Sequence, residues 1–274
     1  MKNFLKWTGI VLAGIFGIIL LASLILYPIG MKKLTQSFQG IQVGSIEIPG
    51  SIPDALDHGR HVSIIWGCSE CHGENMSGKL FTNDPFLGTI LAPNLTSGNG
   101  GIAGSFSDTD WIRAIRHGVK PDGQVEVFMY DYSTMSDRDL GDLISYLKQI
   151  PAVDSNFPPA HIGLIPPIAP AIGLFIPAAD LINHDAPRPT DPIPGGTVDY
   201  GKYLSAICFN CHGTDLASKL GTWKQEDFIK AIRTGDLPDG RRINPEMSSK
   251  TFTEMNDTEL AALWLYLQSL SPVK

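Results

Sequence analysis

The chain has 274 residues, 43% of them hydrophobic and 18% charged, with 28 acidic side chains against 21 basic ones. This balance fits a globular protein of one large or two small domains, with a membrane segment raising the apolar share. Beyond residue 33 there remain 17 basic and 28 acidic side chains, a formal charge of −11. Because a nucleic-acid binder needs a basic surface to neutralise phosphates, we expect no nucleic-acid partner.

The N-terminus carries an uncharged run of 25 residues, Trp7–Met31, which is apolar almost throughout. About 20 apolar residues cross a bilayer, whereas a cleaved signal peptide has an apolar region of only about 7–15. Lysines flank both ends, and Trp7 and Tyr27 stand where interfacial aromatic residues belong. We predict an uncleaved transmembrane helix over residues 1–33, with a removed signal peptide or a buried soluble helix as the weaker alternatives.

The remainder of the chain is an internal repeat. The stretch "DWIRAIRHGVKPDG" from Asp110 returns as "DFIKAIRTGDLPDG" from Asp227, and "SDRDLGDLISYLKQI" returns as "NDTELAALWLYLQSL". In the second pair a capping residue, Ser136 or Asn256, precedes an acid three positions on, and apolar residues follow at helical spacing. The fold class predicted is all-α, with two small tandem domains at residues 34–150 and 198–274.

Two segments lie outside this repeat. The first copy holds 23 extra residues before its middle helix, and their string "NDPFLGTILAPNLTSGNGGIAG" predicts a surface loop, with a docking or haem-covering role as the minor alternative. Residues 151–197 contain 11 of the 20 prolines and few charges. Such an apolar, Pro-rich segment predicts an extended strap packed on one or both domains rather than a mobile tether.

The motifs "CSECHG" and "CFNCHG" hold all four cysteines. A structural zinc site needs its ligands close together, and a redox C-x-x-C needs no following histidine. C-x-x-C-H is instead the attachment signature of c-type haem. We therefore predict two covalently bound haem c groups, with thioether and histidine attachment at these residues: Cys68, Cys71, His72, Cys208, Cys211 and His212.

A methionine is the usual sixth ligand of such an iron. Met129 lies six residues after Gly123, and Met247 lies seven after the equivalent Gly240. We predict these two as iron ligands together with the two histidines. Met135 is the fallback for the first haem, although it precedes a closing helix as Met255 does and its position is typical of core packing.

Other conspicuous side chains have plainer interpretations. Arg116 and Arg233 occupy matched positions and either pair with a haem propionate or face solvent. Trp66 and Tyr203 are expected to pack on the closing helices rather than to conduct electrons. The unmatched histidines are predicted to serve surface or packing roles: His58, His61, His117, His161 and His184.

The repeated words, with "YGKYLSAICFNCHG" and "INHDAPRP" beside them, resemble membrane-anchored dihaem cytochromes c with class I domains in tandem. They are similar to cytochrome subunits of membrane-bound dehydrogenases. The resemblance implies haem domains on the periplasmic side of the cytoplasmic membrane and an N-terminus inside. It usually includes Met-Pro at the distal ligand, whereas here Tyr130 follows Met129 and Ser248 follows Met247.

These features predict an electron carrier without catalytic residues. Two six-coordinate irons leave no vacant site for a substrate, and an acidic surface favours a redox partner with a basic docking patch. The expected partner is a membrane-bound dehydrogenase or a respiratory or photosynthetic complex. The alternative is a dihaem redox enzyme of the peroxidase or thiosulfate-oxidising type, with a displaceable Met129.

Overall fold

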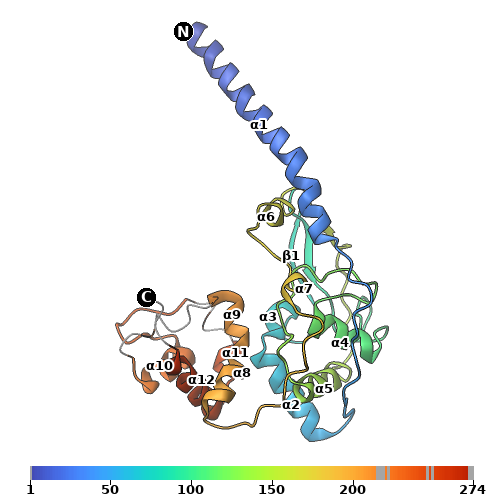
Figure 1. The fold of residues 1–274 in the computed structure, drawn as a ribbon, viewed down its shortest axis with the longest axis vertical. Coiled ribbons are helices and arrows are strands. Elements are labelled where there is room, and N and C mark those ends of the chain that lie inside the picture. Colours follow the sequence, from blue (N-terminus) through green and yellow to red (C-terminus); the bar gives the residue numbers. More distant parts are fainter. Residues whose placement is uncertain (1, 214–219, 221–222, 245–246, 248–249, 271–274) are drawn as a thin grey trace.

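The computed structural model describes residues 2–213, 220, 223–244, 247 and 250–270 (Figure 1). The described elements are α1 (Lys2–Leu34), α2 (Pro53–Ile65), α3 (Cys68–His72), β1 (Lys79–Asp84), β2 (Gly88–Ala92), α4 (Asp108–His117), α5 (Asp137–Leu147), β3 (His161–Ile162), α6 (Ile168–Ala171), α7 (Ala178–Leu181), α8 (Val198–Leu204), α9 (Ala206–His212), α10 (Gln225–Thr234), α11 (Lys250–Thr253) and α12 (Asp257–Ser269). Helices predominate, as expected.

A small antiparallel sheet, in the order β1-β2-β3, departs from the all-α expectation. The stretch predicted as a surface loop forms part of a β-hairpin, because the Asp84 carboxylate accepts hydrogen bonds from the backbone of Phe86 and Leu87, at 2.8 and 2.9 Å, and closes the turn. The strap supplies β3, whose His161 pairs with Thr89 of β2. Pairing over such a sequence distance leaves no local signal, so the loop prediction was wrong here.

Helix α1 stands clear of the other elements over most of its length (Figure 1). Its segment Lys6–Leu34 is long and apolar enough to cross a membrane, and the side chains along it are exposed. Its last turns meet α6 of the strap, where Lys33 Nζ donates to the Pro170 carbonyl at 2.9 Å. A Cβ added at Gly30 would lie 1.6 Å from the Pro167 carbonyl oxygen, so only glycine permits this approach.

Two helix pairs carry the core: α2 crosses α5, and α8 crosses α12. A Cβ at Gly59 of α2 would lie 2.1 Å from the Asp142 carbonyl oxygen, and a Cβ at Gly201 of α8 would lie 1.9 Å from that of Ala262. Asp142 and Ala262 hold equivalent places in the repeated closing helices. Both pairs therefore make the same close, glycine-dependent crossing.

The repeated arginines tie each middle helix to its closing helix. Arg116 of α4 pairs with Asp137 at 2.7 Å and donates to the Met135 carbonyl at 3.1 Å. Arg233 of α10 pairs with Asp257 at 3.1 Å. Each guanidinium thus meets a carboxylate in the first turn of a closing helix, where negative charge is favourable. These ion pairs within the chain were part of neither expectation for the two arginines.

The two helix pairs face each other through reciprocal contacts. His61 of α2 hydrogen-bonds to Glu259 of α12 at 2.7 Å, and the Tyr203 hydroxyl of α8 donates to Asp139 of α5 at 2.5 Å. The Tyr203 ring lies edge-on to the indole of Trp66, with centroids 5.5 Å apart. Trp66 and Tyr203 therefore pack against one another between the pairs, and the expectation that they pack on the closing helices was incomplete.

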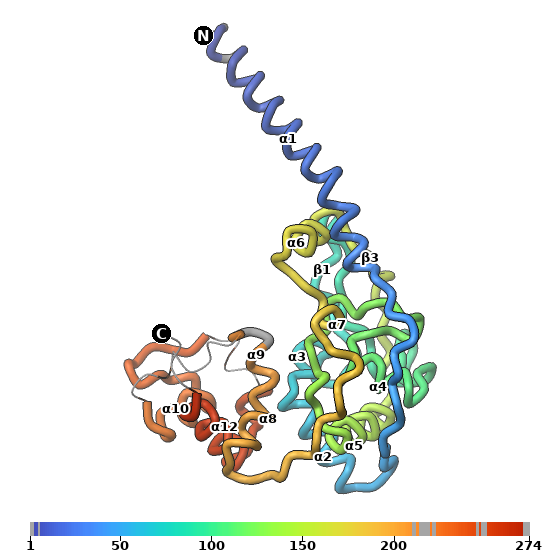
Figure 2. Tube along the Cα trace, viewed as in Figure 1, coloured from blue at the N-terminus to red at the C-terminus, as the bar shows by residue number. Residues whose placement is uncertain are grey.

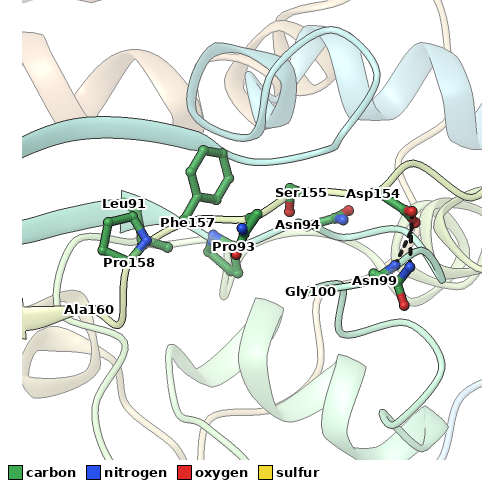
Figure 3. A pocket seen from close by; sticks show the side chains of 11 residues that line it. Leu91, Pro93, Asn94, Asn99, Gly100, Asp154, Ser155, Phe157, Pro158 and Ala160 are labelled. Atoms are coloured by element: carbon green, nitrogen blue, oxygen red, sulfur yellow. Dashed lines mark hydrogen bonds between the residues drawn. The ribbon is translucent and has the colours of Figure 1, made fainter.

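The strap follows the first helix pair for much of its length (Figure 2). At its start, Asp154 accepts two hydrogen bonds from Asn99, from the backbone at 2.8 Å and from the side chain at 2.9 Å (Figure 3). Further on, Nδ1 of His184 lies 3.1 Å from Nδ1 of His117, which ends α4. Long-range polar contacts thus hold the strap against the body of the protein.

Candidate functional site

The first cysteine motif lines a cavity of about 350 Å³. Its one-turn helix α3 lies between Gly67 and Gly73, whose φ values of 76° and 80° suit glycine and confine the helix to five residues. Three-residue spacing on a helix brings Cys68 and Cys71 to one side. Residues from β2, α4 and the segment before α5 complete the walls, including Ile90, Leu91, Leu95, Trp111, Ile115, Met129, Tyr132 and Met135.

His72 is oriented by a backbone carbonyl. Its Nδ1 donates to the Pro93 carbonyl oxygen at 2.9 Å, which leaves Nε2 as the nitrogen with a lone pair. Burial lowers the pKa of this imidazole, so it stays neutral. Metal-binding histidines characteristically use one ring nitrogen in this way, because the hydrogen bond fixes both the tautomer and the ring orientation. His72 thus has the form of an iron ligand.

The two thiols of the first motif do not behave as thiolates. Burial raises the pKa of Cys68 to about 12, and burial also raises the pKa of Cys71. The two residues form no disulfide, and the described part of the chain contains no group of three His, Cys, Asp or Glu side chains suited to a metal ion. Reactive and redox thiols have lowered pKa values instead. The geometry therefore favours covalent attachment of a cofactor over redox chemistry or zinc binding.

Both candidate sulfur ligands of the first site line the cavity. Met129 is partly exposed, whereas Met135 is fully buried in the core beside α5. Met135 and its counterpart Met255 are 0% and 1% exposed, as core residues are. Their shared burial matches the core role predicted for this pair, while the position of Met129 leaves it as the ligand we propose.

The walls suit a flat, largely apolar group that carries carboxylates. Nε1 of Trp111 is fully buried and has no hydrogen-bond partner among the described residues, and its side chain lines the cavity. A buried N–H without a partner is costly, and a carboxylate of a bound group would satisfy it. Lys120, Gln124 and Glu126 supply polar lining, and burial raises the pKa of Glu126. Haem has this combination of apolar body and carboxylates, so the residues fit it.

The second motif follows α8 directly and forms α9. Nε2 of His212 lies 3.2 Å from the sulfur of Met247, so the two predicted axial residues face each other. The Cys208 side chain is half-buried and packs at the edge of the core. The Cys211 side chain and residues 214–219 lie outside the described residues, so the rest of this site is not described.

Sequence reasoning missed several residues around the first cavity. Trp111 stands where the second copy has Phe228, so the added indole N–H was a readable difference between the copies. The Tyr132 ring lies 6.1 Å from that of Trp66 and continues an aromatic contact toward Tyr203. His161 lines the cavity although it was expected to lie away from it. Its position depends on strap pairing, for which there was no local signal.

Comparison with known proteins gives relatives of one kind, although no family model matches the chain. It is 22% identical over 258 residues to the fructose dehydrogenase cytochrome subunit of Gluconobacter japonicus, covering 79% of this chain and 52% of that protein. It is 24% identical over 279 residues to the cytochrome c subunit of a quinone alcohol dehydrogenase from Gluconacetobacter polyoxogenes, covering 81% and 58%. The same identity and coverage hold for the cytochrome c subunit of the quinone alcohol dehydrogenase from Komagataeibacter europaeus.

The resemblance to cytochrome subunits of membrane-bound dehydrogenases is thereby confirmed over most of the chain, at low identity. The chain spans about half the length of the curated relatives it matches first. This similarity supports haem c as cofactor and electron transfer as the general role.

Proposed function

We propose that the chain is a membrane-anchored dihaem cytochrome c that passes electrons from a dehydrogenase to a downstream acceptor. The observation that carries this proposal is His72, whose hydrogen-bonded ring presents Nε2 in the cavity lined by Cys68 and Cys71. Haem c supplies a one-electron iron couple when bound. We expect the chain itself to have no catalytic residue.

Each residue of the first site has a defined role. Cys68 and Cys71 hold the group covalently, His72 binds iron on one face, and Met129 binds it on the other. Trp111 donates its buried N–H to a propionate. The surrounding apolar side chains exclude water, which raises the potential of the couple because the oxidised form carries more charge.

The second site repeats the first. Cys208 and Cys211 provide attachment, while His212 and Met247 are the axial pair. Their facing atoms support this pairing. The two tandem cytochrome c-type domains of this proposal, 34–150 and 198–274, are joined by the strap 151–197.

Helix α1 anchors the protein in the cytoplasmic membrane with its N-terminus inside. The length and apolar composition of Lys6–Leu34 support a membrane span. Haem attachment outside the membrane, as the resemblance implies, sets the orientation. The acidic character beyond residue 33 favours a dehydrogenase with a basic docking surface.

The test is to express the full chain with a cytochrome c maturation system and to count haem against protein. We expect two covalent haems per chain in the membrane fraction and one after joint Cys68→Ala and Cys71→Ala substitution. The same joint change at Cys208 and Cys211 is the matched control and should also leave one. A single haem in the unsubstituted protein would refute the dihaem proposal, and high-spin iron in the resting protein would favour the enzyme alternative.

A further inference from the structure

An apolar surface lies beside the membrane helix, and we call it the apron. It consists of exposed side chains from the tip of the β1–β2 hairpin and from the middle of the strap: Phe86, Leu87, Leu164, Ile165, Ile172, Leu174 and Ile176. Leu174 is 79% exposed, and Phe86 and Leu164 are each 60% exposed. Contiguous exposed side chains of this kind usually mark an interaction site.

The hairpin and strap parts of the apron form one surface. The Ile165 backbone donates to the Phe86 carbonyl at 3.1 Å, and the Gly163 backbone donates to that of Leu87 at 3.1 Å. Figures 1 and 2 show β1 and α6 together at the lower end of α1. The hairpin tip therefore extends the surface that the strap begins.

The apron is also joined to α1. The Pro167 carbonyl oxygen sits directly against Gly30, and Lys33 donates to the Pro170 carbonyl at 2.9 Å. These contacts lie at the two ends of α6 and of the last turn of α1. The height of the apron along the helix is therefore set by the protein.

That height coincides with the end of the apolar span. At about 1.5 Å per residue, Trp7–Met31 extends about 37 Å, somewhat more than a hydrocarbon core of about 30 Å. Gly30 is at the C-terminal end of this run, and Lys32 and Lys33 follow it. Because these lysines belong at the headgroups, α6 lies where the bilayer meets water.

The backbone of this segment is suited to leaving water. No residue from Ile162 to Ala179 is charged. Within it, the N–H groups of residues 168, 169 and 171–174 all donate to carbonyls of the same segment, and Pro166, Pro167 and Pro170 have no N–H. Unsatisfied backbone donors are the main obstacle to burying a non-helical segment in lipid, and this segment has satisfied them.

We propose that the apron inserts into the outer leaflet of the bilayer that α1 crosses, as a second, non-spanning membrane contact. The occupant is lipid rather than a protein partner, because the surface is continuous with a helix whose own side chains face lipid. The inference rests on the proposed membrane span of α1. It gives the 23-residue excursion a role, since β2 lines the cofactor cavity while the hairpin tip enters the membrane. The first site is thereby held at a fixed height and tilt.

The experiment places a nitroxide label at one introduced cysteine in the full-length holoprotein, reconstituted in phospholipid vesicles. The native cysteines are proposed to be thioethers, so labelling of the unsubstituted protein checks that part of the proposed function separately. Leu174→Cys tests the apron. Ile193→Cys, in a strap residue that is 85% exposed but distant in sequence from the apron, is the aqueous control, and Leu20→Cys in α1 is the membrane control.

Collisions of each label with oxygen, which concentrates in lipid, and with a water-soluble nickel chelate are compared. We expect the label at Leu174 to lose most of its chelate collisions and to keep its oxygen collisions, as at Leu20, with the reverse at Ile193. Chelate access at Leu174 equal to that at Ile193, with Leu20 protected, would overturn the apron and leave the anchor intact. Protection at Leu174 from both agents would indicate burial by another copy of the chain and would also overturn it. Exposure at Leu20 would remove the anchor on which the inference rests.

Discussion

The close crossing of α2 and α5 predicts a large effect from one added methyl group. In Gly59→Ala the new Cβ would lie 2.1 Å from the Asp142 carbonyl oxygen and 2.6 Å from its carbon, where ordinary contacts begin at 3.4 Å. The helices must therefore separate by about 1.3 Å at this point. Because both neighbouring atoms belong to the backbone of α5, no side-chain rotation can relieve the contact.

The magnitude follows from two opposing effects. Replacing glycine by alanine in a helix gains up to about 1 kcal/mol of helix propensity. Overpacking of this kind costs about 1–3 kcal/mol, and backbone neighbours place it at the upper end. We expect Gly59→Ala to lower the free energy of unfolding by about 1–2 kcal/mol.

Urea unfolding of the full-length holoprotein in detergent measures this loss. Gly104→Ala is the matched control, because a Cβ there would meet no heavy atom within 4 Å, and it should change the free energy by less than about 0.5 kcal/mol. Gly201→Ala should reproduce the loss in the second helix pair. Equal midpoints for Gly59→Ala and Gly104→Ala would refute the reasoning.

Three further predictions concern single side chains. Met129→Ala should diminish the near-infrared charge-transfer band of the oxidised protein, whereas Met135→Ala should keep the band and lower the free energy of unfolding by about 2–5 kcal/mol. The hydrogen bond to Glu259 raises the pKa of His61 above 6.5. Its stabilisation is therefore full below pH 6.5 and lost as the pH rises through the raised value, and His61→Gln should remove that slope from the pH dependence of unfolding. Burial lowers the pKa of His117 to about 4. Stability should therefore fall between pH 6.5 and 4, and His117→Gln should abolish the fall. Equal band losses in both methionine variants, or slopes that survive the histidine substitutions, would contradict these assignments.

Local signals carried the helical prediction a long way. Asn256 and Glu259 form the reciprocal capping box that their spacing predicted, because both partners lie within one turn. The same spacing was only half successful at Ser136. Its hydroxyl caps Asp139, but the Asp139 carboxylate turns away to accept from Tyr203 of the other helix pair. Short-range capping is readable from spacing, whereas competition from a distant hydroxyl is not.

The candidate site divides in the same way. His72 and Met247 were predicted from motif and offset, and the structure places each in the surroundings its role requires. Pro93 and His161 approach the first site through a loop and a strap far along the chain. Their places depend on sheet pairing across about 70 residues, between β2 and β3, which no periodicity announces.

The reciprocal contacts between the helix pairs carry an evolutionary consequence. His61 stands two residues after Gly59, as Tyr203 stands two residues after Gly201, and each binds the acid at the third position of the opposite closing helix. A contact in which matched positions reach across to matched positions is the arrangement of a two-fold symmetric dimer. Joining two such subunits in one chain keeps the arrangement while releasing each half from having to be identical. One half could then adopt an imidazole with glutamate and the other a phenol with aspartate, so a single ancestral contact became two with different responses to pH.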